Sequence, residues 1–152
     1  MGAGDSLFAY VLILVAAAGL LLAGLVFGMA ALMQRMFRRV SGLAALAERY
    51  PADSAPSGEI RQRQRIRIGA VDYRNCVDLS LDAKGLWFNV RGLLGKGQPV
   101  LIPWSEFGSP QPTRFYLWKS MRLSVGRPPV TTMVLPETFF EKIEPYLDMN
   151  AG

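Results

Sequence analysis

The fold is decided first by the stretch from Leu7 to Met33, which reads LFAYVLILVAAAGLLLAGLVFGMAALM and is apolar at every position except three glycines. It carries no charged side chain. A helix rises about 1.5 Å per residue, so about 20 such residues cross a hydrocarbon core of about 30 Å. A cleaved signal peptide would have a basic start and a shorter apolar core, whereas residues 1–6 contain no Lys or Arg. The sequence therefore predicts one uncleaved transmembrane helix over 7–33.

The basic residues next to this stretch all follow it. Arg35, Arg38 and Arg39 come directly after it and Arg49 lies a little further on, whereas residues 1–6 carry none. Because Lys and Arg close to a span favour the cytoplasmic side, we expect residues 1–6 outside and everything after the span in the cytoplasm. At their spacing the first three of these arginines share one side of a continued helix, where they can reach lipid phosphates.

Two glycines within the span, Gly24 and Gly28, form a GxxxG pattern, which lets two helix backbones approach closely. Pairing with a second copy of the chain or with another membrane helix is one interpretation. Chance is the other, since Gly is common in membrane helices. The span contains no Asp, Glu, Lys, Arg, Asn or Gln, so it offers no ion or proton path, and a transporter or channel is not expected.

The composition excludes several classes of active site. The chain has no His and a single cysteine, Cys76, so it can form neither a Ser-His-Asp nor a Cys-His nucleophilic site. By itself it also lacks the ligands of a zinc site. A single cysteine makes no internal disulfide, which suits a reducing cytosol. We therefore expect a protein that is not an enzyme, with no catalytic residue, no metal site and no cofactor.

Residues 34–60 are predicted to connect the span to a folded domain. Ser41 can cap a short helix, which either lies along the membrane or docks on the domain. Its apolar positions are Leu43, Leu46, Ala47 and Tyr50. Residues 51–58 are rich in Pro, Ser and small residues, a composition typical of a linker. We place the domain boundary there, so that the domain covers 61–147 and residues 148–152 form a tail.

Arginine occupies every second position at the start of this domain. Because successive side chains of a strand alternate between its faces, Arg61, Arg63, Arg65 and Arg67 are expected to share one side. This Arg ladder could bind anionic lipid, at about 1 kcal/mol per basic residue near a charged leaflet, or an acidic protein partner. The alternative is the solvent-exposed face of an edge strand, where basic residues discourage aggregation.

From Val71 onward, apolar residues recur with period two between Gly- and Pro-marked turns, which predicts strands. The turn Asp82–Gly85 joins two of them, with Gly85 at a position where a positive φ costs little, and the alternation places Asp78 and Asp82 on the solvent face. Later strands are predicted over Val100–Trp104, Phe115–Trp118, Met121–Val125 and Val130–Leu135. Between these elements, the glycine-rich loop 91–99 presents three residues suited to contact a protein, which are Leu93, Leu94 and Lys96.

A helix is predicted from Glu137 to about Glu144, because its apolar residues recur at helical spacing and Pro145 limits its extension. With roughly six or seven antiparallel strands, this predicts an α+β fold. We expect the transmembrane helix to be followed by a bent sheet or small barrel with a carboxyl-terminal helix.

Three segments resemble the small bacterial domains that are similar to the pleckstrin-homology and GRAM folds. They are the hairpin Leu79–Val90, the run Val100–Phe107 and the strand-to-helix passage Val134–Leu147. The resemblance implies a bent antiparallel sheet capped by one helix, and binding to protein or lipid rather than catalysis. The chain also resembles short membrane-anchored bacterial proteins with no assigned activity. It departs from inositide-binding members of the family in the first hairpin turn, Tyr73–Cys76, which carries a single basic residue.

Several aromatic residues in the domain stand near basic ones, as in a stacking platform for single-stranded nucleic acid. Aromatic residues on strands are more often core residues or cross-strand pairs, so no nucleic-acid partner is expected. The aromatic residues are Trp87, Trp104, Phe115, Tyr116 and Trp118, and the basic ones are Arg114, Lys119 and Arg122.

Two hypotheses of function follow. The first is a non-catalytic interaction or assembly module, anchored by a single span in the bacterial inner membrane, whose cytoplasmic domain binds components of a membrane complex through Leu93, Leu94 and Lys96. The second is peripheral docking on anionic lipid through the Arg ladder and the three arginines after the span. Lipid docking would weaken with salt, because exposed charges are screened over about 8–10 Å at physiological ionic strength.

Overall fold

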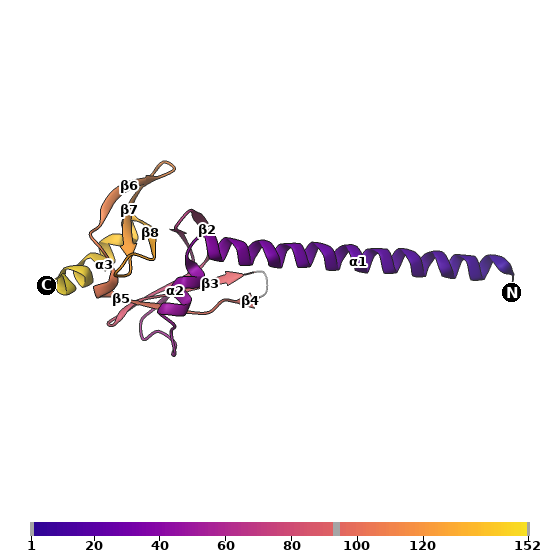
Figure 1. Ribbon diagram of the computed structural model, residues 1–152, viewed down its shortest axis with the longest axis horizontal. Helices are drawn as coiled ribbons and strands as arrows, with labels where there is room; N and C mark the ends of the chain where they lie inside the picture. Colours follow the sequence, from indigo (N-terminus) through magenta and orange to yellow (C-terminus); the bar gives the residue numbers. More distant parts are fainter. Residues whose placement is uncertain (1, 93–94, 152) are drawn as a thin grey trace. The chain divides into compact units, whose positions relative to one another are not determined.

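The computed structural model describes residues 2–92 and 95–151 (Figure 1). The helices are α1 (Ala3–Val40), α2 (Leu43–Arg49) and α3 (Glu137–Asn150), with a short 3₁₀ helix, η1 (Trp104–Glu106). The strands are β1 (Ile60–Ile68), β2 (Val71–Asp82), β3 (Gly85–Gly92), β4 (Gly95–Lys96), β5 (Val100–Pro103), β6 (Gln111–Phe115), β7 (Trp118–Val125) and β8 (Thr131–Pro136). The chain divides into two compact units, Met1–Arg35 and Met36–Gly152.

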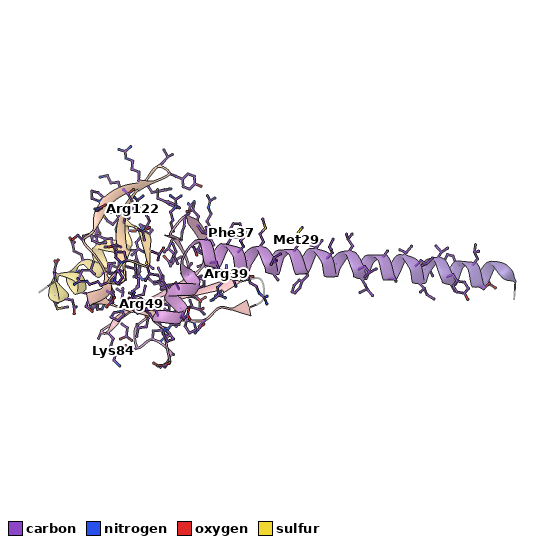
Figure 2. All side chains as sticks on the ribbon, viewed as in Figure 1. Met29, Phe37, Arg39, Arg49, Lys84 and Arg122 are labelled. Atoms are coloured by element: carbon purple, nitrogen blue, oxygen red, sulfur yellow. The ribbon has the colours of Figure 1, made fainter. Side chains whose placement is uncertain are left out.

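α1 contains the predicted span. Residues Gly4–Val40 form one helix that is long and apolar enough to cross a membrane. Asp5 in its first turn and Arg38 and Arg39 in its last turn carry the charges that favour those ends of a helix dipole. Side chains stand out from α1 along its length (Figure 2), and most of its large apolar ones expose more than half of their surface. Exposing such an apolar surface to water is costly. That the helix crosses a membrane stays a prediction, as do its direction and the kind of membrane.

The strands of the second unit form an antiparallel sheet in the order β4-β3-β2-β1-β8-β7-β6, which confirms the α+β fold class. β5 pairs with the first half of β3, and β4 pairs with the end of β3. β5 and β4 therefore lie one after the other along the same edge of β3. After η1 the chain reaches the other side of the sheet, where Phe107 bridges Val125 before β6 begins.

β1 and β2 are irregular where they pair. The register shifts between Arg61 and Gln64 and again between Gln64 and Ile66. Two residues near these shifts have a positive φ without being glycine, namely Arg63 at 55° and Asn75 at 53°. An extra residue in one strand leaves that residue unpaired and bends the strand. The simple alternation that places four ladder arginines on one side is therefore interrupted.

One hydrophobic core joins the sheet to the two short helices. Its fully buried side chains include Phe88 and Leu123 from the sheet, Leu46 from α2 and Ile143 from α3. α3 packs on β7, β8 and η1. Its helix runs on to Asn150, beyond the predicted end at Glu144, so Pro145 lies inside it and residues 148–150 are not a tail.

The continuation of α3 past Pro145 has a packing reason. Proline removes one backbone hydrogen bond and strains the preceding turn. Beyond it, however, the ring of Tyr146 stacks on Trp104 with centroids 5.0 Å apart, and Leu147 packs against the core. These contacts favour keeping the last turns of the helix in place.

α2 docks on the domain, which decides between the two alternatives left open by the sequence. Its predicted apolar positions are all buried. Gly42 occupies the N-cap position of α2, and Ser41 precedes it. The Oγ of Ser41 nevertheless accepts a hydrogen bond from the backbone N–H of Leu43 at 3.2 Å, which is the role of a capping side chain. At the other end, Tyr50 O accepts from Leu101 N–H at 3.0 Å. The folded unit therefore includes α2 and begins earlier than the predicted boundary.

The segment 51–58 is also part of the folded unit rather than a free linker. Ala52 N–H donates to Pro99 O at 3.1 Å, and Ser57 Oγ donates to Asp82 at 2.8 Å. At Gly58 a Cβ atom would lie 2.2 Å from Leu81 O and 3.1 Å from Ser80 Oγ. Only glycine allows the segment to approach the β2 backbone so closely.

Two expectations for the β2–β3 hairpin are corrected. Asp78 is buried rather than on the solvent face. Its carboxylate accepts hydrogen bonds from Arg91 Nε at 2.9 Å and from the Arg63 N–H at 3.4 Å, which offset the cost of burying it. The turn after Asp82 forms as predicted, since Asp82 pairs with Gly85. Gly85, however, is not among the residues with positive φ. Glycine is required there because a Cβ would lie 2.1 Å from Ile102 O in the neighbouring strand.

Candidate interaction surface

The most exposed apolar residue among those described in the domain is Leu117, and it lies with two exposed aromatic residues at the end of the β6–β7 hairpin. Phe115 pairs with Trp118, so Tyr116 and Leu117 form a two-residue turn. Tyr116 is 61% exposed, Leu117 96% and Trp118 68%. We call these three residues the hairpin tip. The prediction of one strand over Phe115–Trp118 was wrong, because this segment is the turn between two strands.

A layer of basic and aromatic side chains supports the hairpin tip. The guanidinium of Arg67 lies 4.5 Å from the ring centre of Phe115, and that of Arg65 lies 4.8 Å from Phe115 and 5.1 Å from Tyr116. Arg74 lies 5.2 Å from the ring centre of Tyr116 and donates a hydrogen bond to its hydroxyl. We call these five residues the Arg–aromatic cluster. Cations at such distances are attracted to aromatic rings, so the cluster fixes the base of the hairpin tip.

The cluster shows how much of the predicted Arg ladder is realised. Arg65 and Arg67 lie on the same side of β1, and Ile66 and Ile68 turn into the core, as strand alternation requires. Arg61 precedes the register shifts and Arg63 lies within the first of them, and neither makes any of these ring contacts. The ladder therefore divides into two pairs, and only the second pair supports the hairpin tip.

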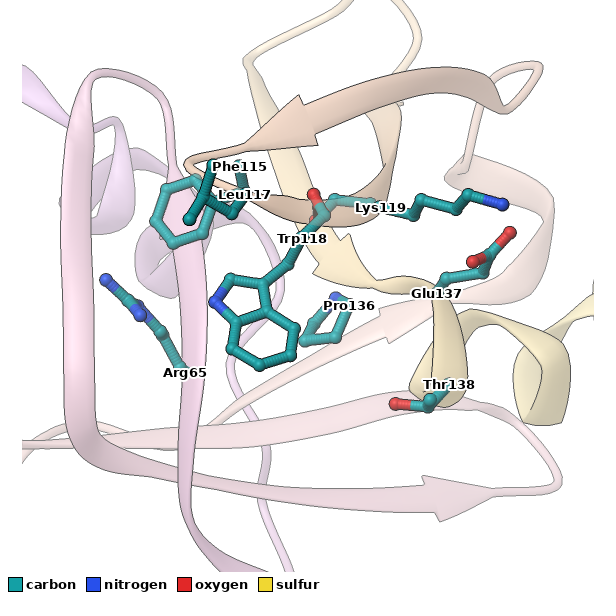
Figure 3. Close-up of a pocket in the computed structure, with 9 residues that line it drawn as sticks. Arg65, Phe115, Leu117, Trp118, Lys119, Pro136, Glu137 and Thr138 are labelled. Atoms are coloured by element: carbon teal, nitrogen blue, oxygen red, sulfur yellow. Dashed lines mark hydrogen bonds between the residues drawn. The ribbon is translucent and has the colours of Figure 1, made fainter.

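A cavity of about 520 Å³ opens beside the hairpin tip, between the β6–β7 hairpin and the start of α3 (Figure 3). Trp118 forms one wall, and its indole lies between Arg65 and Pro136. Lys119 and Glu137 lie together at another side of the cavity. Its volume is in the range of small-molecule sites, and its lining joins an aromatic wall to two basic side chains.

The charge around the hairpin tip is predominantly positive. Residues 111–125 include three basic residues and no acidic one. Asp72 forms ion pairs with Arg67 and with Arg74. Within the described part of the chain, no carboxylate lies within ion-pair distance of the remaining cations, which are Arg65, Arg114, Lys119 and Arg122. The buried Nε atom of Arg65 also has no hydrogen-bond partner there.

In the Arg–aromatic cluster, the hydrogen bond to Asp72 raises the pKa of Arg67, which stays charged. Tyr50 and Cys76 also have shifted pKa values and lie outside the cluster. Tyr50 donates a hydrogen bond to Glu106 at 2.6 Å, and burial, followed by this bond, raises the pKa of Tyr50 to about 12. Burial also raises the pKa of the Cys76 thiol. Both groups therefore keep their protons at neutral pH and are poor bases or nucleophiles. Within residues 2–92 and 95–151, no three Cys, Asp or Glu side chains gather as a metal site.

The other predicted contact residues belong to other elements or lie outside the described residues. Leu93 and Leu94 lie outside the described residues, and only the backbone of Lys96 is described, in β4. Arg35, Arg38 and Arg39 all lie on α1. At Gly24 and Gly28 a Cβ atom would meet nothing within 4 Å, so this side of α1 is open in the single chain.

The aromatic residues form no joint stacking platform, since Trp87, Trp104 and Phe115 are buried, the core positions that the sequence analysis favoured. Tyr116 and Trp118 are the exposed members, and the sequence reasoning missed their position at a turn. The Tyr-Leu pair has none of the Gly, Pro, Asn or Asp residues that usually mark turns. The run of apolar residues between Arg114 and Lys119 was the available signal.

Comparison with known proteins adds no further constraint. No family model, no curated protein and no solved structure matches the chain.

Proposed function

We propose that this chain is a non-catalytic interaction module, held at a membrane by α1, whose β domain contacts another component of the membrane surface. The observation that carries the proposal is the hairpin tip. Leu117, at 96% exposed, contributes almost nothing to the core of its own domain. A contiguous exposed apolar site edged by basic residues is typical of a surface that binds a partner or a membrane.

Tethering would make weak contacts sufficient. The domain unit begins at Met36, close behind the apolar segment that ends at Met33. A unit of this size has a radius of gyration of about 13 Å, so whichever way it is turned it stays within a few tens of ångströms of the anchor. Confinement of this kind raises the effective concentration of a binding surface for partners in the same membrane.

We place residues 1–6 outside and the domain in the cytoplasm, at a bacterial inner membrane, because the arginines follow the span. One candidate partner is a protein component of a membrane complex, for which Leu93, Leu94 and Lys96 are the contact residues expected from the sequence. Pairing through Gly24 and Gly28 would add a second copy of the chain. Anionic lipid is the second candidate, and the cations around the hairpin tip favour it.

Photo-crosslinking in native membranes tests the proposal. A photo-reactive phenylalanine analogue replaces Leu117 in one variant and Lys84 in a matched control, because Lys84 is also exposed but lies on the β2–β3 turn. We expect position 117 to give crosslinks to a lipid or protein and position 84 to give far fewer. Equal yields at the two positions would overturn the proposal that the hairpin tip is the contact surface.

A further inference from the structure

We propose that the hairpin tip inserts into the headgroup region of an anionic bilayer, while the basic side chains around it bind lipid phosphates. This inference rests on the proposed function and names the component that the hairpin tip contacts. The insertion is carried by Tyr116, Leu117 and Trp118. The phosphate contacts are carried by Arg65, Arg114 and Lys119.

The residue types and their geometry suit a bilayer interface. Trp and Tyr have amphipathic rings that are enriched where hydrocarbon meets headgroups. At the hairpin tip they flank a leucine that is almost wholly exposed, on a two-residue turn that projects from the sheet. A projecting apolar turn requires either a matching cavity in a partner or a fluid phase that adapts to it, and a bilayer is such a phase.

The charges select an anionic surface. Arg114 and Lys119 face each other across the hairpin, since they are paired in register directly behind the Phe115–Trp118 pair. Both are exposed, and neither has an ion pair among the described residues. When the hairpin tip enters the headgroup region, these two side chains reach the level of the phosphates. Each basic residue near a charged leaflet adds to the attraction.

The cavity beside Trp118 provides room for a headgroup next to these cations. Arg65 and Lys119 both line it, and the buried Arg65 Nε lacks a partner within the described chain. Glu137 also lines the cavity and opposes an anion on its own side. A phosphate would therefore lie toward Arg65, where the aromatic wall of Trp118 lies beside it (Figure 3).

The Arg–aromatic cluster prepares the hairpin tip for insertion. The ring of Tyr116 is contacted by Arg65 and Arg74, and Phe115 is held by Arg65 and Arg67. A turn already held in its bound shape loses little conformational freedom on binding. The anchor then keeps a bilayer permanently within reach, which is why a bilayer is favoured here over a protein partner.

Tryptophan fluorescence of the full-length chain in proteoliposomes tests this inference. The chain has three tryptophans, of which Trp87 and Trp104 are buried and Trp118 is exposed. Lipids brominated near the top of their acyl chains quench an inserted indole. The emission of Trp118 is the difference between the unaltered chain and a Trp118→Phe variant. We expect brominated lipids to quench this emission in phosphatidylglycerol vesicles and to quench it far less in phosphatidylcholine vesicles. High salt should reduce the quenching.

Variants at exposed positions keep the test independent of folding. Leu117→Asp should abolish the quenching, and Arg114→Gln with Lys119→Gln should reduce it several-fold. Met149→Asp, at an exposed apolar residue of α3, is the matched control and should leave it unchanged. Unquenched Trp118 in phosphatidylglycerol, or equal quenching in both lipids, would overturn the inference. If position 117 still crosslinked to a protein, the proposed function would stand and only the bilayer insertion would be wrong. If position 117 crosslinked to nothing, the proposed function and the bilayer insertion would both be wrong.

Discussion

Replacing Leu46 by Ala tests whether α2 belongs to the folded domain. Leu46 is fully buried in the core although it precedes the predicted linker. The change removes three carbon atoms, worth about 2.4 kcal/mol at about 0.8 kcal/mol each. The cavity left behind adds to this loss, and buried Leu→Ala changes cost about 2–5 kcal/mol. We expect the free energy of unfolding to fall by about 3 kcal/mol.

Urea unfolding of the full-length chain in mild detergent measures the effect through the emission of the buried Trp87 and Trp104. With a slope of about 1–3 kcal/mol/M, the midpoint should fall by about 1–3 M. Leu21→Ala, at an exposed position of α1, is the control and should leave the domain midpoint unchanged. Leu46→Met should restore most of the stability, because it conserves volume. If Leu46→Ala shifted the midpoint no more than Leu21→Ala, the reasoning that α2 forms part of the core would be refuted.

Two further predictions concern buried polar contacts, and both are read from unfolding midpoints. The pKa of Tyr50 is about 12 in the folded chain and about 10 when unfolded, so its contribution to stability is complete below pH 10 and is lost as the pH rises toward 12. Tyr50→Phe should therefore lose less stability than the unaltered chain between pH 10 and pH 12, and parallel curves would contradict the raised pKa. Arg91→Met leaves the buried carboxylate of Asp78 without its ion pair. It should cost about 2 kcal/mol, less than the 3–5 kcal/mol of a fully buried pair, because the Arg91 side chain is 37% exposed. Adding Asp78→Asn should recover part of this loss, and no recovery would show that the ion pair is not responsible.

The elements that were predicted well are those whose signal is local. Each of these signals lies within one short stretch of sequence. They are the apolar run of α1, the alternation along β2 and β3, and the helical spacing of α3. The docking of α2 could not be decided this way, since an apolar side suits a membrane as well as a domain. Its position depends on residues that are distant in the sequence. These are β5, which bonds to Tyr50, and Thr131, whose hydroxyl donates to Ser41 O at 2.8 Å.

The errors at the candidate site have the same origin. The ladder arginines were assigned to one side because period two holds along a regular strand, and the register shifts that break it arise from pairing with β2. The hairpin tip was missed because its turn has no residue typical of turns. Its cluster brings together residues from β1, β2 and β6, so no local pattern could have placed Arg65 beside Phe115.

The conformation of the hairpin tip gives a reason to relate it to binding rather than to folding. Tyr116 has a φ of 56°, a region where residues other than glycine pay about 1 kcal/mol or more. A glycine there would avoid this cost, and two-residue hairpin turns commonly use one. Contacts with Arg74 and Arg65 compensate in part for Tyr116, but the exposed surfaces of Leu117 and Trp118 gain little within the domain. Folding stability alone therefore does not account for this turn, whereas an apolar end edged by unpaired cations is what contact with an anionic bilayer would require.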